Sequence, residues 1–165
     1  MSEVAWAGRF LEARIDGTWE YAARKGAIGA AVILAVEDGH VLLVEQYRVP
    51  LGRNCIELPA GLVGDEADGE AAEAAAAREL EEETGYRAGH MEDMGIFASS
   101  PGMTSETFHL MRATRLEKVH DGGGVDGENI IVHRIALADI APFLATKRRQ
   151  GCAMDVKLLP LLGLL

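Results

Sequence analysis

The segment 77–85 holds the residues best suited to chemistry, because it repeats carboxylates at helical spacing. At about 100° per residue in an α-helix, Glu79, Glu82 and Glu83 share one edge. Like charges this close repel, which raises their pKa values or lowers stability unless a cation lies among them. Mg²⁺ bound by carboxylates and substrate phosphates would resolve the conflict, with Mn²⁺ as an alternative ion. Arg78, four residues before Glu82, can hold that carboxylate in place.

Three clustered glutamates alone are also typical of a solvent-exposed helix rich in Ala and Glu. The neighbouring residues favour the metal site, because the stretch resembles the Nudix signature, G-x5-E-x7-R-E-U-x-E-E-x-G-U with U aliphatic or aromatic. The matching positions are Glu70, Arg78, Glu79, Leu80, Glu82, Glu83, Gly85 and Tyr86. Membership of that family would make the chain an enzyme that hydrolyses a diphosphate linked to another group.

The first glycine of that signature has two candidate positions. Gly64 gives the literal spacing, whereas Gly61 ends a Leu-Pro-Ala-Gly corner that resembles the start of the family's loop. We favour Gly61, which lengthens the loop by three residues and leaves the role of Glu70 open. In the family, the main-chain carbonyl at the Ala60 position also binds metal. The resemblance therefore predicts four metal-binding positions: Ala60, Glu79, Glu82 and Glu83.

Two further segments resemble the ADP-ribose pyrophosphatase branch of the family. Pro101 and Gly102 follow two serines at the spacing from the signature that this branch shows, although a proline-glycine pair alone is an ordinary turn signal. The sequence Glu-Gln-Tyr at 45–47, followed by Arg48 and Pro50, forms the second segment. The resemblance implies that Arg48, Pro101 and Gly102 contact substrate.

The N-terminal region carries a third resemblance, in Trp19 and Arg24. In ADP-ribose pyrophosphatases, an aromatic residue here stacks on adenine and an arginine contacts the diphosphate or ribose. Aromatic rings accept any purine face, and arginine offers a planar fork to phosphate. Trp6 could supply a second stacking face, although both tryptophans are also compatible with core positions. In that branch the N-terminal hairpin contributes to an intertwined dimer, so the resemblance alone implies a homodimer.

The segment 121–128 is rich in glycine and acidic residues and precedes a predicted strand. ADP-ribose pyrophosphatases often place an acidic residue on the corresponding loop, where it activates water or completes metal binding. Asp126 and Glu128 are the candidates, and Glu128 is preferred because it is closest to the strand. A plain solvated loop is the alternative.

Together these resemblances predict a small-molecule nucleotide substrate, with ADP-ribose cleaved to AMP and ribose 5-phosphate. Glu128, Asp126 or a helix glutamate such as Glu82 would take a proton from the attacking water. Other Nudix substrates stay open, namely GDP-mannose, NADH and dinucleoside polyphosphates, as does a catalytically silent domain that senses a nucleotide. Sensor domains usually lose metal-site glutamates, and this chain keeps them.

The composition argues against several kinds of partner. A formal net charge of −10 argues against nucleic acid, whose binding depends on clustered Lys and Arg. No stretch approaches the roughly 18 apolar residues of a membrane span, and the N-terminus lacks the pattern of a signal peptide. Cys55 and Cys152 form no metal-ligand or disulfide pattern, so we expect a cytoplasmic protein.

Two hairpins are predicted in the first part of the chain. Segments 4–14 and 17–24 alternate imperfectly around Asp-Gly, a strong turn dipeptide, and segments 27–36 and 40–46 form a second, more buried pair. A strand at 55–58 should then lead into a turn.

The predicted turn lies at 59–61, and a helix should span 69–84, with Asp68 as its N-cap and Gly85 at its end. Further strands are predicted near 94–98, 107–113 and 130–135, with loops at 62–68 and 121–127. Two short helices broken at Gly151 should follow.

The expected fold is α/β in composition, of the α+β kind, with a mixed sheet sandwiched between helices. We assign residues 27–165 to this domain and residues 1–26 to an N-terminal hairpin segment.

Overall fold

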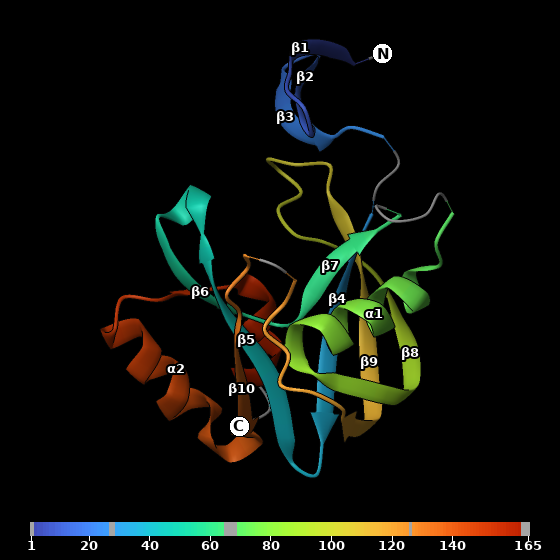
Figure 1. Cartoon of the computed structure of the whole chain (residues 1–165). Helices are drawn as coiled ribbons and strands as arrows, with labels where there is room; N and C mark the ends of the chain where they lie inside the picture. Colours follow the sequence, from blue (N-terminus) through green and yellow to red (C-terminus); the bar gives the residue numbers. More distant parts are fainter. Residues whose placement is uncertain (1, 27–28, 65–68, 126, 163–165) are drawn as a thin grey trace.

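The computed structural model describes residues 2–26, 29–64, 69–125 and 127–162, which form two β-sheets (Figure 1). Across the larger sheet the order is β11 (Ala153–Met154), β6 (Arg53–Glu57), β5 (His40–Arg48), β4 (Gly29–Glu37), β9 (Thr107–Lys118) and β8 (Tyr86–Ala98). Two strands pair outside this path, β10 (Ile131–Ala136) with β5 and β7 (Ala60–Val63) with β4. Because β4 runs parallel to β9 and β11 parallel to β6, while other pairs are antiparallel, the predicted mixed sheet is confirmed.

The smaller sheet contains the antiparallel strands β1 (Glu3–Ala7), β2 (Leu11–Asp16) and β3 (Trp19–Arg24). The predicted turn at Gly17 is confirmed, with a φ of +60° there. The prediction of one continuous arm over 4–14 is wrong, because the chain turns after β1 and the Gly8 amide donates to the Leu11 carbonyl at 2.8 Å. A Cβ at Gly8 would lie 2.4 Å from the Trp6 ring, so glycine here allows the ring to lie over the turn.

The predicted central hairpin is confirmed at its turn, where Asp38 and Gly39 have φ values of +50° and +69°. The two strands pair only beside that turn. Beyond it they separate, as β4 joins β7 and β9 while β5 joins β6 and β10. The sheet therefore opens between the far ends of β4 and β5.

The segment after Pro59 is a strand rather than the predicted turn. Residues 60–63 form β7 and pair antiparallel with β4, so the chain reverses direction after β6 as predicted, but the turn is confined to residues 58–59 and the loop start at 62 is wrong. The Pro59 carbonyl also accepts the Ile33 amide at 2.8 Å. Since β4 is buried, its backbone groups need partners, and an extended neighbour supplies them.

Helices cover both faces of the larger sheet, as predicted. One cluster packs α1 (Ala72–Thr84) against alternate residues of β4, and its fully buried members include Ala31, Ile33, Ala35 and Leu80. The other cluster packs α2 (Ile140–Arg149) and α3 (Leu159–Leu162) against the opposite face, and its buried members include Val32, Leu43, Ile140 and Leu161. The strand period of two thus sends neighbouring residues to opposite layers.

Helix α1 begins at Ala72, three residues later than predicted. Ala71 is its N-cap, with extended backbone angles and no side-chain capping bond, while the predicted cap Asp68 lies outside the described residues. The predicted end is confirmed, because Gly85 has a φ of +75° and its amide donates to the Glu81 carbonyl at 2.8 Å. The chain leaves the helix where a left-handed residue is required.

Strands β8 and β9 extend well beyond the predicted segments 94–98 and 107–113, because they pair along a long antiparallel ribbon. The C-terminal part contains the two predicted helices and, between them, the unpredicted strand β11 and the 3-10 turn Val156–Leu158. Among the described residues, no helix has the length and apolar character needed to cross a membrane.

Candidate active site

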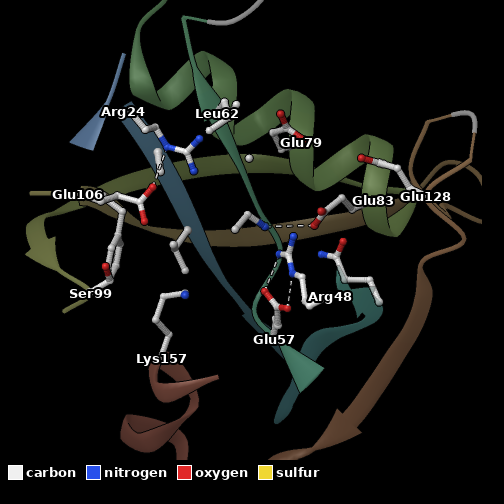
Figure 2. A pocket seen from close by; sticks show the side chains of 16 residues that line it. Arg24, Arg48, Glu57, Leu62, Glu79, Glu83, Ser99, Glu106, Glu128 and Lys157 are labelled. Carbon is white, nitrogen blue, oxygen red and sulfur yellow. Dashed lines mark hydrogen bonds and ion pairs between the residues drawn. The ribbon is translucent and has the colours of Figure 1, made fainter. Parts of the chain in front are cut away.

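A cavity of about 390 Å³ opens where β4 and β5 diverge, and Ala30, Val32, Gln46 and Arg48 line it from these strands (Figure 2). The described residues around it include five carboxylates: Glu57, Glu79, Glu83, Glu106 and Glu128. They also include three cations: Arg24, Arg48 and Lys157. A wall that mixes these charges can hold phosphate groups together with metal cations.

Glu83 is the most buried carboxylate of α1, with 5% of its surface exposed. Its Oε2 accepts a hydrogen bond from the Ala60 amide at 3.1 Å. Burial raises the pKa of Glu83 to about 8, the Ala60 amide opposes that shift, and the charges of Glu79 and Glu128 add to it. At neutral pH this carboxyl therefore ionises readily only when a cation is close.

Glu79 lines the same cavity and lies against the backbone of β7. A Cβ placed on Gly61 would come within 1.9 Å of the Glu79 carboxyl carbon. Only glycine at position 61 leaves room for this carboxylate beside the strand. Gly61 thus permits Glu79 and Glu83 to reach one cavity from successive turns of α1.

Arg78 binds two of the helix carboxylates. Its guanidinium lies 3.0 Å from Glu79 and 3.4 Å from Glu82. Glu82 is oriented toward Arg78, keeps 34% of its side chain exposed, and is not among the residues that line the cavity. The structure thus brings Glu79 and Glu83 together at the cavity but leaves the predicted ligand Glu82 beside it.

The two candidate signature glycines have different roles. Gly64 has a φ of +87° and donates its amide to Glu70 at 3.2 Å. Glu70 in turn lies 3.5 Å from Arg78. Gly61 instead accommodates Glu79. Gly64, the glycine of the literal spacing, is therefore the one that contacts Glu70. Gly61, the glycine that we favoured from the sequence, instead leaves room for the carboxylate of Glu79.

The donor chemistry of this cavity fits a divalent cation. Among the described residues, no group of three His, Cys, Asp or Glu side chains is already arranged around one point. Glu79, Glu83 and Glu128 are nevertheless among the five carboxylates that line one cavity, and burial beside like charges raises the pKa of Glu83. A hard cation with oxygen ligands would relieve that repulsion.

The end of α1 is joined to the loop that carries Glu128. Four loop amides donate to carbonyls at the helix end: Val119 and His120 to Gly85 (2.8 and 3.2 Å), Gly123 to Glu83 (2.9 Å), and Gly124 to Glu82 (3.0 Å). A Cβ on Gly122 would lie 2.4 Å from the Thr84 backbone, so the approach requires glycine. These bonds satisfy carbonyls that a helix end otherwise leaves free.

Glu128 reaches from this loop toward the end of α1 and lines the cavity (Figure 2). Its Oε2 accepts the Val125 amide at 2.9 Å, which holds the carboxylate in one orientation. The other predicted loop residue, Asp126, lies outside the described residues.

Arg48, a predicted substrate contact, lines the cavity but is already bound to a carboxylate. Its Nε and Nη2 lie 2.6 and 2.7 Å from the two oxygens of Glu57, which is 4% exposed. The hydrogen bond to Glu57 is the largest of the effects that raise the pKa of Arg48. Glu57 was missed from the sequence, although its place at the end of a predicted strand could have indicated it.

Arg24 also reaches the cavity, at the side where the small sheet joins the body of the protein. Its Nε lies 2.7 Å from Glu106. The Ala22 amide donates to the Met103 carbonyl at 2.9 Å, and the Ser105 amide donates to Ala22 at 3.0 Å. Strand β3 and the segment 99–106 therefore hold Arg24 in place.

A second hollow of about 410 Å³ lies between β3 and the same segment. Trp19, Pro101 and Gly102 line it together, so three predicted substrate contacts share one surface. Trp19 is 62% exposed and Trp6 is 60% exposed, which excludes the core positions that we considered for both. Trp6 does not line either of these two hollows.

Comparisons with known proteins show which family and fold this chain resembles. Residues 25–150 match the family profile described as the NUDIX domain. The chain is 32% identical over 157 residues to the methanol dehydrogenase activator of Bacillus methanolicus, covering 89% of this chain and 82% of that protein. It is 38% identical over 113 residues to an ADP-ribose pyrophosphatase of Bacillus subtilis, covering 67% of this chain and 60% of that protein. A crystal structure of an ADP compounds hydrolase has the same fold, with a TM-score of 0.67, 23% identity, and coverage of 88% of this chain and 80% of that one.

Proposed function

This chain belongs to the Nudix hydrolase family, and we propose that it hydrolyses the diphosphate bond of a nucleoside diphosphate sugar. The favoured substrate is ADP-ribose, cleaved to AMP and ribose 5-phosphate. The observation that carries the proposal is the cavity in which Glu79 and the buried Glu83 face arginine and lysine side chains. The similarity to an ADP-ribose pyrophosphatase supports the choice of sugar nucleotide.

Glu79, Glu83 and the main chain at Ala60 would hold a divalent cation, with Mg²⁺ favoured and Mn²⁺ as a substitute. When bound, such a cation neutralises diphosphate charge and lowers the pKa of a bound water. Glu82 stays a predicted ligand, and it would have to leave Arg78 to join the others.

Glu128 is the preferred acceptor of the proton from the attacking water, because it lines the cavity and is held by the Val125 amide. Asp126 stays an alternative on the same loop. Arg78 acts as a positioning residue, since it restrains Glu79 and Glu82 from the side. Arg48 and Arg24 offer the remaining faces of their guanidinium groups to the diphosphate.

The nucleoside end of the substrate would occupy the hollow beside Trp19. The exposed indole ring offers a stacking face for adenine, and Pro101 and Gly102 form the facing wall. The small sheet also exposes Trp6 and Phe10, which supports the proposed homodimer through the N-terminal segment. We retain the cytoplasmic location as a proposal from the cysteine pattern.

A panel hydrolysis assay in Mg²⁺ tests the function. The substrates are ADP-ribose, GDP-mannose, NADH and diadenosine polyphosphates, and the enzymes are the wild type, Glu83→Gln, Glu82→Gln and Glu81→Gln. Glu81 is the matched control, because it lies on the same helix but binds Arg87 at 2.9 Å, outside the cavity.

We expect hydrolysis of ADP-ribose, measured as AMP release, to be faster than hydrolysis of the other substrates. Activity should be lost in Glu83→Gln and Glu82→Gln and kept in Glu81→Gln. Preference for another member of the panel would replace ADP-ribose as the proposed substrate but would leave the proposed diphosphate hydrolysis unchanged. A folded protein in Mg²⁺ that hydrolyses none of them would support a nucleotide sensor instead.

A further inference from the structure

Lys157 reaches the cavity from a part of the chain far from the Nudix signature. The Asp155 amide donates to the Ile56 carbonyl at 3.0 Å, and β11 pairs in parallel with β6 just before it. These contacts hold the C-terminal segment beside the strand that ends at Glu57. Figure 2 shows the Lys157 side chain pointing into the cavity from the wall away from α1.

The ammonium group is held rather than free in solvent. It lies 2.5 Å from Asp155 and 5.7 Å from the centre of the Phe108 ring, and 18% of the side chain is exposed. An ammonium has three donors, and the bond to Asp155 occupies one direction. The remaining donors can serve a ligand in the cavity.

The charges around the cavity give Lys157 a distinct place among its cations. Arg24 and Arg48 are paired with Glu106 and Glu57, and both of those carboxylates line the cavity. The partner of Lys157, Asp155, is not one of the lining residues. Lys157 is therefore paired as well, but from outside the lining, so no lining carboxylate forms an ion pair with its ammonium.

We propose that Lys157 binds the diphosphate of the substrate from the wall opposite the carboxylate helix. The diphosphate would then lie between two sources of positive charge, the cation site at α1 on one side and this ammonium on the other. Lys157 contributes mainly to substrate affinity, because it contacts phosphate oxygens in both the bound and the reacting state. The role rests on the proposed hydrolysis of a diphosphate.

Lys147 is a closely matched control. Its side chain is also 18% exposed, its ammonium lies 2.6 Å from Glu45, and it lies 5.8 Å from the Phe143 ring. Unlike Lys157, it does not line the cavity. Lysine-to-methionine changes at the two positions therefore remove the same charge from side chains of equal exposure, with only one facing the proposed substrate.

The test compares Lys157→Met, Lys157→Gln and Lys157→Arg with Lys147→Met. Calorimetry measures binding of inorganic pyrophosphate with Mg²⁺, and steady-state kinetics with ADP-ribose give KM and kcat. We expect Lys157→Met and Lys157→Gln to weaken pyrophosphate binding and raise KM by about tenfold, with kcat changed less than about threefold. Lys157→Arg should recover part of the loss, and Lys147→Met should stay within about twofold of the wild type in both constants.

Thermal unfolding confirms that each variant is folded, and Lys157→Gln replaces Lys157→Met should the latter not fold. Unchanged pyrophosphate binding in a folded Lys157 variant overturns the proposal, as does an equal loss in Lys147→Met. Because pyrophosphate binding needs no turnover, a failure of ADP-ribose hydrolysis is seen separately from a failure of this contact.

Discussion

Two glutamates expose almost the same small fraction of their surface in this protein yet have opposite surroundings. Glu45 is 6% exposed and accepts hydrogen bonds from Lys147 at 2.6 Å, Asn54 at 2.9 Å and His133 at 3.0 Å. Burial raises its pKa, but these donors outweigh burial and lower the pKa to about 2. Glu83 is 5% exposed, accepts one backbone amide, and has a pKa raised to about 8.

The difference separates a structural carboxylate from a functional one. The region around Glu45 supplies its own cations and donors, so its charge is stabilised within the fold. The region around Glu83 adds the like charges of Glu79 and Glu128, so its charge needs a partner from outside the chain. Burial of a carboxylate alone does not indicate a functional site, whereas burial without compensating cations or hydrogen-bond donors does.

Glu83→Gln should impair catalysis at the functional glutamate of this comparison. We expect kcat for ADP-ribose to fall about 1,000-fold, equivalent to about 4 kcal/mol, because the cation loses a buried ligand. Glu45→Gln, at equal burial, should keep kcat within about threefold. Steady-state assays on folded samples of both variants measure this. Similar losses in the two would mean that burial, and not the cavity, decides the effect.

Glu45→Leu should lower stability at the structural glutamate of this comparison. Removing the carboxylate leaves Lys147 and His133 without their acceptor, so we expect the free energy of unfolding to fall by about 3 kcal/mol. Denaturant unfolding without metal measures the change. Glu83→Leu in the same experiment should cost less, because Glu83 accepts one backbone amide whereas Glu45 accepts from Lys147, Asn54 and His133. A larger loss at Glu83 than at Glu45 would contradict the assignment.

Gly122→Ala tests how the backbone fixes the functional region, where loop amides rather than side chains hold the helix end. The added Cβ would lie 2.4 Å from Thr84, so we expect about 2 kcal/mol lower stability and weaker activity as Glu128 shifts. Gly39→Ala is the control, since Gly39 has the same φ of +69° with no atom within 4 Å of its Cβ position. Equal effects would show that backbone strain alone is responsible.

The pH dependence of stability should differ in sign between the two glutamates. The pKa of Glu83 is raised from 4.5 to about 8, so its contribution in metal-free protein is full below pH 4.5 and is lost as pH rises through 8. The pKa of Glu45 is lowered to about 2, so its contribution is present above pH 4.5 and is lost as pH falls toward 2.

Unfolding curves from pH 3 to pH 9 without metal can separate these contributions. The stability of Glu83→Gln relative to wild type should rise by at least about 1 kcal/mol between pH 5 and pH 8. The deficit of Glu45→Gln should shrink below pH 4.5. A Glu83→Gln difference that does not change with pH would contradict the unusual ionisation of Glu83.

The carboxylates of α1 were predictable because helical periodicity is local. The spacing placed Glu79 and Glu83 on one edge, and both line the cavity. The contact of Glu82 with Arg78 was also predicted from their spacing of four residues, whereas the position of Glu82 outside the cavity lining was not. The mixed sheet and its helices followed from alternating and helical patterns, whereas β7 required knowledge of its partner β4.

Contacts distant in sequence account for what was missed. Lys157 reaches the cavity only because β11 pairs with β6, and that pairing has no motif. Glu45 meets Lys147 across 102 positions of the chain. Glu45 and Arg48 lie in one short segment, which gave no sign that one would be structural and the other would line the cavity.

The most direct test of the cation site is Mg²⁺ titration by calorimetry of the wild type, Glu83→Gln and Glu45→Gln. We expect similar Mg²⁺ affinities for the wild type and folded Glu45→Gln, and at least about tenfold weaker binding for Glu83→Gln. Equal Mg²⁺ affinity in Glu83→Gln and the wild type would contradict this expectation, because the buried carboxylate of α1 would then have no part in holding the ion.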